Sequence, residues 1–446
     1  MREGGGPRAA SPTSRFPPTP SRPKTSSRQT SREPAAGFEG ESAAAMTTLT
    51  PADAAEAAEA VTQAAADRAS LSIVGLGSKS ALGRPWNAER RLDLSRLSGV
   101  TMYEPAELVL CAQAATPLDD IQALLSANGQ ELAFEPMSFD ALYGAGAGSI
   151  GGALMANLSG PRRIKAGAAR DHILGVKAIN GRGEAYKAGG TVVKNVTGYD
   201  LARGLAGSFG ALAVVTQVNF KVLPRAQTSA SLMLSGLAPK VAVAALCAAM
   251  GAPVDVSGAA HLPDFAARAL GFSAPATLLR LEGFSSSVDE RFSWLREQLK
   301  DFAAGERLDA PESERVWRAV RDVVPLANER EKVIWRVSVA PTSGPALAAA
   351  VARAYGGQAM FDWSGGLVWL ALDPDAAPDG GAELIRGAVA VQEDGHATMI
   401  RAPDEMRTRA PVFQPLAPAL EALSARLKAQ FDPYSILERG RLRAAS

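Results

Sequence analysis

The pattern of apolar and polar positions changes character near residue 226. Before that point, short β-rich runs alternate with glycine-rich loops, and we predict strands at 71–74, 108–114, 173–180, 185–188 and 211–223. A helical period is confined to an alanine-rich stretch at 51–67, a scaffold helix that begins near Pro117, and a short turn at 201–205. Because few helices separate the strands, the pattern favours an α+β domain over a doubly wound parallel sheet.

After residue 226, alanine-rich helices and short strands replace the glycine loops. We predict helices at 241–250, 287–302, 344–355, 382–391 and 415–429, and strands at 277–283, 335–340, 358–363, 367–372 and 397–401. The elements from 335 to 401 follow the order strand–helix–strand–strand–helix–strand, which is similar to a ferredoxin-like split βαβ unit. The second half is therefore predicted to be a smaller α+β domain.

Residues 1–45 have the composition of an unfolded segment. They are rich in Pro, Ser, Arg and Gly and too poor in apolar residues to offset the entropy of ordering. We interpret them as a disordered tail or as a mis-assigned start, with translation beginning at Met46. An organelle transit peptide is the alternative, which the acidic residues Glu3, Glu33, Glu39 and Glu41 disfavour.

Charge and cysteine content exclude several classes of function. The chain of 446 residues carries 47 Lys and Arg against 46 Asp and Glu, so no net field attracts nucleic acid or an anionic membrane. Two distant cysteines, Cys111 and Cys247, exclude a disulfide framework, a cysteine-rich zinc site and an iron–sulfur cluster held by this chain. The three histidines show no metal-binding spacing, so we expect no metal.

The stretch from 144 to 160, GAGAGSIGGALMANLSG, is the strongest local signal. Six of its seventeen residues are glycine, and glycine lets the backbone approach a ligand closely and adopt positive φ. Such a loop can direct several N–H groups at one anion, typically a phosphate. A second turn, Gly75-Leu-Gly-Ser-Lys79, follows a predicted strand and could add a hydroxyl and a charge. We therefore predict a cofactor with a diphosphate.

A nicotinamide site is one alternative for this stretch. Gly146, Gly148 and Gly151 match the spacing of the dinucleotide fingerprint, and Asp171 lies twenty residues further on. The context does not fit, because residues 136–143 are not a buried strand and Gly160-Pro161 interrupts the following helix. We reject this reading.

The order of the motifs resembles the PCMH-type (vanillyl-alcohol-oxidase-like) family of FAD-binding domains. The matching segments are 74–78, 134–136, 148–160, 170–171, 189–200, 207–210 and 212–216, with a C-terminal stretch at 431–441. Residues 159–163, 167–175 and 193–200 are similar to its glycolate and D-lactate dehydrogenase branch, and to the FAD-binding subunits of bacterial glycolate oxidases. The resemblance implies an FAD-binding domain over 46–225, a cap domain over 226–428, and a segment, 429–446, that returns to the FAD domain.

The resemblance also assigns cofactor contacts. The FAD diphosphate would meet the first turn and the second loop, the ribityl chain would follow the end of that loop, and one residue would pack near the adenine. These residues are, in that order, Gly75, Leu76, Gly77 and Ser78; Gly148, Ser149, Ile150, Gly151 and Gly152; Asn157, Ser159 and Gly160; and Val214. Neither loop holds the His or Cys by which some members attach FAD covalently, so the FAD is expected to be non-covalent.

Catalytic residues are not identified by the sequence. Oxidising a 2-hydroxy acid needs a base and a cation for the carboxylate, yet the Glu-His-Gly motif of self-sufficient members is missing. His261, in a loop-like context, and His396 are interpreted as surface or structural residues, and His172 follows the flavin loops. Arg336 and Trp363 are the candidates for substrate binding, against the alternative of a solvated arginine and a core tryptophan.

Three functions stay open from the sequence. The first is an FAD-carrying subunit that works with a second FAD-binding subunit and an iron–sulfur subunit of a glycolate oxidase complex. The second is a self-sufficient D-2-hydroxy-acid dehydrogenase, and the third is a non-catalytic assembly subunit. We prefer the first, with a small 2-hydroxy acid as substrate, no nucleic-acid partner, and a cytoplasmic location in which any membrane association comes through partner subunits.

Overall fold

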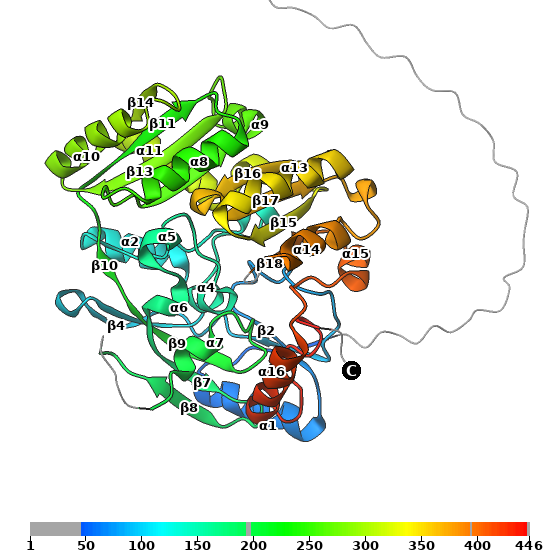
Figure 1. The fold of residues 1–446 in the computed structure, drawn as a ribbon. Helices are drawn as coiled ribbons and strands as arrows, with labels where there is room; N and C mark the ends of the chain where they lie inside the picture. Colours follow the sequence, from blue (N-terminus) through cyan, green and yellow to red (C-terminus); the bar gives the residue numbers. More distant parts are fainter. Residues whose placement is uncertain (1–45, 193–197, 393–394, 444–446) are drawn as a thin grey trace, which may run out of the picture. The chain divides into compact units, whose positions relative to one another are not determined.

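The computed structural model describes residues 46–192, 198–392 and 395–443, and Met46–Ser446 is one compact unit (Figure 1). The predicted tail at 1–45 lies outside the described residues, as do residues 193–197 of the 189–200 loop.

A small parallel sheet begins the described chain. Its strand order is β1-β3-β2, with β1 at Thr47–Leu49, β3 at Arg90–Asp93 and β2 at Leu71–Val74. The predicted amphipathic helix is α1 (Ala54–Asp67), which starts where the Asp53 side chain accepts hydrogen bonds from two backbone N–H groups. Three of its alanines, Ala57, Ala64 and Ala65, are buried with Val61 in the core on this sheet, so α1 is scaffold.

The second sheet is antiparallel and has five strands. Its order is β4-β5-β9-β7-β8, and four helices, α2, α4, α6 and α7, contribute to the apolar core on it. The strands are β4 (Val100–Glu104), β5 (Val109–Gln113), β9 (Val214–Lys221), β7 (Ile173–Ile179) and β8 (Ala185–Gly189); the helices are α2 (Leu118–Ala127), α4 (Ile150–Ala156), α6 (Ala169–His172) and α7 (Leu201–Leu205).

The third sheet has eight antiparallel strands in the order β14-β11-β13-β12-β16-β17-β15-β18, and we call it the cap sheet. Each half is a ferredoxin-like unit, since both use the strand order 4-1-3-2, and the halves meet where His261 pairs with Phe361. The strands are β11 (Thr228–Ser235), β12 (Gly258–Leu262), β13 (Ala276–Gly283), β14 (Gly305–Leu308), β15 (Val333–Ser338), β16 (Gln358–Asp362), β17 (Leu367–Leu372) and β18 (His396–Arg401).

Helices cover the cap sheet on both faces. On one face lie α8 (Pro239–Met250), α10 (Ser285–Gln298), α13 (Gly344–Tyr355) and α14 (Ala382–Ala390). On the other face, α9 (Asp264–Ala269), α11 (Ala310–Arg321) and α12 (Val324–Ala327) share a core with Met137, Phe139 and Leu142. We call this second side the inner face, because it packs against the region that leads into the glycine loop.

The α+β class and the ferredoxin-like order of 335–401 are confirmed, but the first ferredoxin-like unit was missed. The prediction for His261 is wrong in one respect: it lies in β12 and not in a loop, and its side chain is fully buried. It packs next to Phe361, and its Nδ1 lies 3.0 Å from Thr277 Oγ1.

The C-terminal segment lies against the first sheet. After α16 (Pro418–Phe431), Leu437 forms a parallel bridge with Leu71 of β2, and the Glu438 side chain accepts a hydrogen bond from Ile73 N at 2.6 Å. The domain boundaries given above stay a prediction. None of the described helices is long and apolar enough to cross a bilayer.

Candidate functional site

A pocket opens between the two predicted glycine loops. Its walls come from residues 73–80, from α4 and from residues 209–215, which lead into β9, and Arg441 also lines it. Seven of the predicted cofactor residues line this pocket: Gly75, Leu76, Gly77, Ser78, Ser149, Gly151 and Gly152. The structure thus brings together two loops that are about seventy residues apart in the sequence.

Gly148 fixes the approach of the two loops. Its φ is 89°, which L side chains rarely adopt. A Cβ at this position would collide with Ser78 Oγ and would lie 3.0 Å from Lys79 Nζ. Glycine is therefore required for steric reasons as well as for the backbone conformation.

Two cations belong to the same pocket. Lys79 Nζ has the Ser78 hydroxyl as its hydrogen-bond partner, at 3.2 Å, and burial together with the nearby charge of Arg441 lowers the pKa of Lys79 to about 8. Arg441 donates from Nε to Leu82 O at 3.0 Å and lies 3.4 Å from a Glu438 carboxylate oxygen. Glycine N–H groups and an under-paired lysine fit a diphosphate, which accepts hydrogen bonds and carries negative charge.

Other predicted cofactor residues do not line this pocket. Ile150 and Val214 are fully buried in the cores of the second and first sheets. Asn157 and Ser159 accept hydrogen bonds from backbone N–H groups of α6, each at 3.2 Å. The contacts that the resemblance assigned to these four residues stay predictions.

Gly160 leads from the glycine loop to the cap sheet. Its N–H donates to Glu135 O at 2.9 Å, and its carbonyl accepts a hydrogen bond from Trp363 Nε1 at 3.2 Å. Trp363 and Arg336, the two predicted substrate residues, are in contact, with the guanidinium carbon of Arg336 4.8 Å from the centre of the Trp363 ring. The structure therefore joins both candidates to the end of the predicted cofactor loop.

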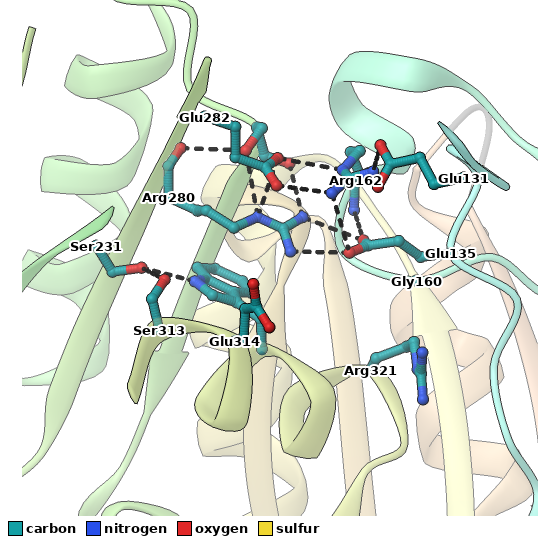
Figure 2. A network of polar contacts seen from close by, with 12 residues as sticks. Glu131, Glu135, Gly160, Arg162, Ser231, Arg280, Glu282, Ser313, Glu314 and Arg321 are labelled. Atoms are coloured by element: carbon teal, nitrogen blue, oxygen red, sulfur yellow. Dashed lines mark hydrogen bonds and ion pairs between the residues drawn. The ribbon is translucent and has the colours of Figure 1, made fainter. Parts of the chain in front are cut away.

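A network of buried charges, which we call the salt-bridge network, links the loop region to β13 (Figure 2). Arg280 donates to both carboxylate oxygens of Glu135, at 2.8 and 3.1 Å. Arg162 makes a second bidentate contact with Glu282, at 2.6 and 3.1 Å, and also pairs with Glu131. Burial alone would raise the pKa of Glu135, but the two guanidinium groups lower it to about 2.

Sequence reasoning did not select these five residues. Glu135 and Arg162 stood inside quoted motifs, but nothing local marked Arg280 and Glu282 as their partners. The partners lie 145 and 120 residues apart, so only the folded chain reveals the pairing.

The histidine near the loops has a structural environment. His172 is buried, its Nε2 lies 2.8 Å from Ala166 O, and its ring packs against Phe134. Burial lowers the pKa of His172, which keeps the ring neutral. Within the described part of the chain, no three His, Cys, Asp or Glu side chains are grouped as a metal site would require.

Comparisons with known proteins agree with this geometry. The family model for an FAD binding domain matches residues 46–189. The glycolate oxidase subunit GlcE of Escherichia coli (strain K12) is 33% identical over 386 residues, which cover 86% of this chain and 96% of that subunit. The glycolate oxidase subunit GlcD of Bacillus subtilis (strain 168) is 36% identical over 85 residues, 19% of this chain and 18% of that subunit.

A solved structure shows the same fold. p-Cresol methylhydroxylase with substrate bound superposes with a TM-score of 0.69 and 13% identity, covering 89% of this chain and 88% of that one. The predicted PCMH-type fold and the FAD cofactor are thus confirmed. The chain is an FAD-binding oxidoreductase subunit, and it belongs to the family of the glycolate oxidase subunit GlcE.

Proposed function

We propose that this chain is the FAD-binding subunit of a glycolate oxidase (glycolate dehydrogenase) complex that oxidises glycolate to glyoxylate. The observation that carries the proposal is its similarity to GlcE along 96% of that subunit. The cations and glycine N–H groups of the pocket support non-covalent FAD binding by Gly75, Leu76, Gly77, Ser78, Gly148, Ser149, Gly151 and Gly152.

FAD, when bound, accepts the two electrons that leave the hydroxy acid. The chain's own contribution is to hold the diphosphate between the two glycine loops and to keep the loop that ends at Gly160 against the cap sheet through Trp363. We place the exit of electrons at a partner that carries an iron–sulfur cluster, because the two cysteines of this chain are too few to bind one.

Assembly with a second FAD-binding subunit and an iron–sulfur subunit belongs to the same proposal. Support comes from the names of the relatives, which are subunits. Further support comes from a row of exposed leucines along α16 and the residues before it, since exposed apolar rows are typical of surfaces that contact another protein. These leucines are Leu416, Leu420, Leu423 and Leu427.

The test is the visible spectrum of the purified full chain under anaerobic conditions, before and after glycolate. We expect a flavin band that stays oxidised until the companion subunits are added and is then bleached. Bleaching by glycolate or D-lactate without companions would instead make the chain a self-sufficient dehydrogenase. A complex that keeps full activity when this chain carries no flavin would make it an assembly subunit, and a chain that never binds flavin would refute the proposal.

A further inference from the structure

We propose that Arg336, Asp362, Trp363 and Arg163 form a binding site for a small 2-hydroxy carboxylate on the inner face of the cap sheet. The inference rests on the proposed function, which supplies a 2-hydroxy acid as substrate, and it names the residues of this chain that would recognise that acid.

Arg336 is a buried cation whose Nη2 has no hydrogen-bond partner among the described residues. It lies in the middle of β15, paired with Trp369 of β17 and Thr398 of β18, and is 4% exposed. Side chains alternate along a strand, and Ile334, two residues earlier, packs in the inner core, so Arg336 points to the inner face as well. Its Nη2 is enclosed and makes no hydrogen bond to the described residues. A guanidinium group buried in this way requires an anion.

Asp362 supplies an acceptor on the same face. It ends β16 two residues after Met360, which also packs in the inner core, and it is 2% exposed. One carboxylate oxygen accepts a hydrogen bond from Trp363 N at 2.7 Å. No ion pair joins this carboxylate to a cation of the described chain, although its charge acts on that of Arg336. The carboxylate can therefore accept a hydrogen bond from a ligand.

Two guanidinium groups lie close to the Trp363 ring. The guanidinium carbons of Arg336 and Arg163 each lie 4.8 Å from the centre of its ring. Arg163 begins the short helix α5 (Arg163–Ala166), three residues after Gly160, and makes no ion pair with the described residues. Two neighbouring cations share one aromatic ring, and no carboxylate of the described residues forms an ion pair with either of them. They create a local positive field that favours an anion.

The arrangement selects a class of ligand. A carboxylate matches the planar fork of Arg336, with Arg163 as a second positive charge. A hydroxyl can donate to Asp362, and a 2-hydroxy acid carries a carboxylate and a hydroxyl on adjacent carbons. Met360, Ile334 and Trp369 line the same face and favour a small, otherwise apolar acid. The hydrogen bond from Trp363 to Gly160 ties this site to the predicted flavin loop.

The experiment measures binding of glycolate and acetate to the full purified chain by calorimetry, with flavin content recorded for each variant. We expect wild type to bind glycolate more tightly than acetate, and Arg336→Gln to weaken glycolate binding at least about tenfold. Asp362→Asn should reduce the preference for glycolate over acetate to about twofold, because its amide still contacts the hydroxyl but without charge. The matched control is Arg353→Gln, an exposed arginine on α13, which should bind like wild type.

Arg163→Gln gives an independent measure if Arg336→Gln does not fold, because Arg163 is only half-buried. It should weaken glycolate and acetate alike. Glycolate binding that is absent in wild type, or unchanged in both arginine variants, would overturn the site. If glycolate binds in an Arg336-dependent manner but flavin is not reduced even with companion subunits, the site stands and the oxidase function fails. If Arg336→Gln is reduced as fast as wild type, the function stands and the site fails.

Discussion

Two groups of buried charge lie on the inner side of the cap sheet, and they differ in one respect. In the salt-bridge network, each guanidinium group faces a carboxylate at hydrogen-bonding distance. Around Trp363, Arg336 and Asp362 are as deeply buried, but no ion pair connects them to each other or to other described residues. Both groups are therefore buried, and they differ in whether their charges form ion pairs.

The difference in pairing indicates a different role for each group of buried charges. Buried charges that are fully paired need no ligand and can stabilise the fold. Here the bidentate contacts of Arg280 and Arg162 join a loop beside the glycine region to strand β13. An unpaired buried group lowers stability unless something else satisfies it. Such a group is retained where a ligand completes it, which is why we assign structure to the first group and recognition to the second.

Breaking the paired group is expected to have the largest effect. Glu135→Gln removes the bidentate carboxylate of the buried Arg280, which keeps only its 3.5 Å contact with Glu282, and we expect the free energy of unfolding to fall by about 3 kcal/mol. Urea unfolding of the full chain at pH 7 measures it. The control is Glu314→Gln, whose exposed pair with Arg225 should be worth less than about 1 kcal/mol. Equal, small effects of both substitutions would show that the network does not hold the fold.

Neutralising Asp362, in the unpaired group, should raise the stability of the protein, whereas neutralising Glu135 lowers it. Burial raises the pKa of Asp362 to about 7, so the folded state holds a proton that the unfolded chain has lost. The stability that this proton provides is present at low pH and is lost as the pH rises through 7. We expect Asp362→Asn to be more stable than wild type at pH 8 by about 3 kcal/mol and to lose most of that advantage by pH 5.

Thermal unfolding at pH 5, 6, 7 and 8 without added carboxylate measures this difference. Asp375→Asn, a change at an exposed position, should follow wild type at every pH. An Asp362→Asn variant less stable than wild type at pH 8 would mean that Asp362 is paired after all.

The glycine loop at Gly148 is built from backbone and holds no buried charge. Substitution there should change the free energy of unfolding less than the two changes above. Gly148→Ala adds a methyl group against Ser78 at positive φ, and Gly146→Ala adds one at positive φ with nothing within 4 Å. Both should lose about 1 kcal/mol through backbone strain. Gly148→Ala should lose about 1–2 kcal/mol more and most of its bound flavin. Flavin absorbance per chain is the measurement, and equal flavin content in the two variants would exclude Gly148 from the cofactor site.

The sequence was sufficient for the parts that depend on local backbone chemistry. The glycine loops around Gly77 and Gly148 stood out because few residues besides glycine adopt their conformations, and their motif order led to the family. Arg336 and Trp363 were found as candidates, but their contact was not. A periodic sequence pattern predicts single strands and helices, but it does not predict that a residue in the middle of one strand contacts a residue in a turn after another.

The features that the sequence did not predict depend on contacts between distant parts of the chain. Strand β12 reads GAAHL, and alanine and glycine are poor strand formers, so the first ferredoxin-like unit was hidden until its neighbours placed it. His261 was misplaced for the same reason. The pairing of Glu135 with Arg280 joins residues 145 positions apart, and charges at that separation carry no sequence signal of partnership.

Strand β2, which leads into the first glycine turn, has hydrogen-bond partners in the C-terminal segment of the chain. Ile73 N donates to Glu438, 365 residues later, and Leu71 N donates to Ile436 O at 2.7 Å. During synthesis, the flavin domain therefore waits for the whole cap to emerge from the ribosome before its edge can close. We therefore expect cofactor loading to be a late event in biogenesis, since the whole cap is synthesised before the strand beside the first glycine turn gains its last partner.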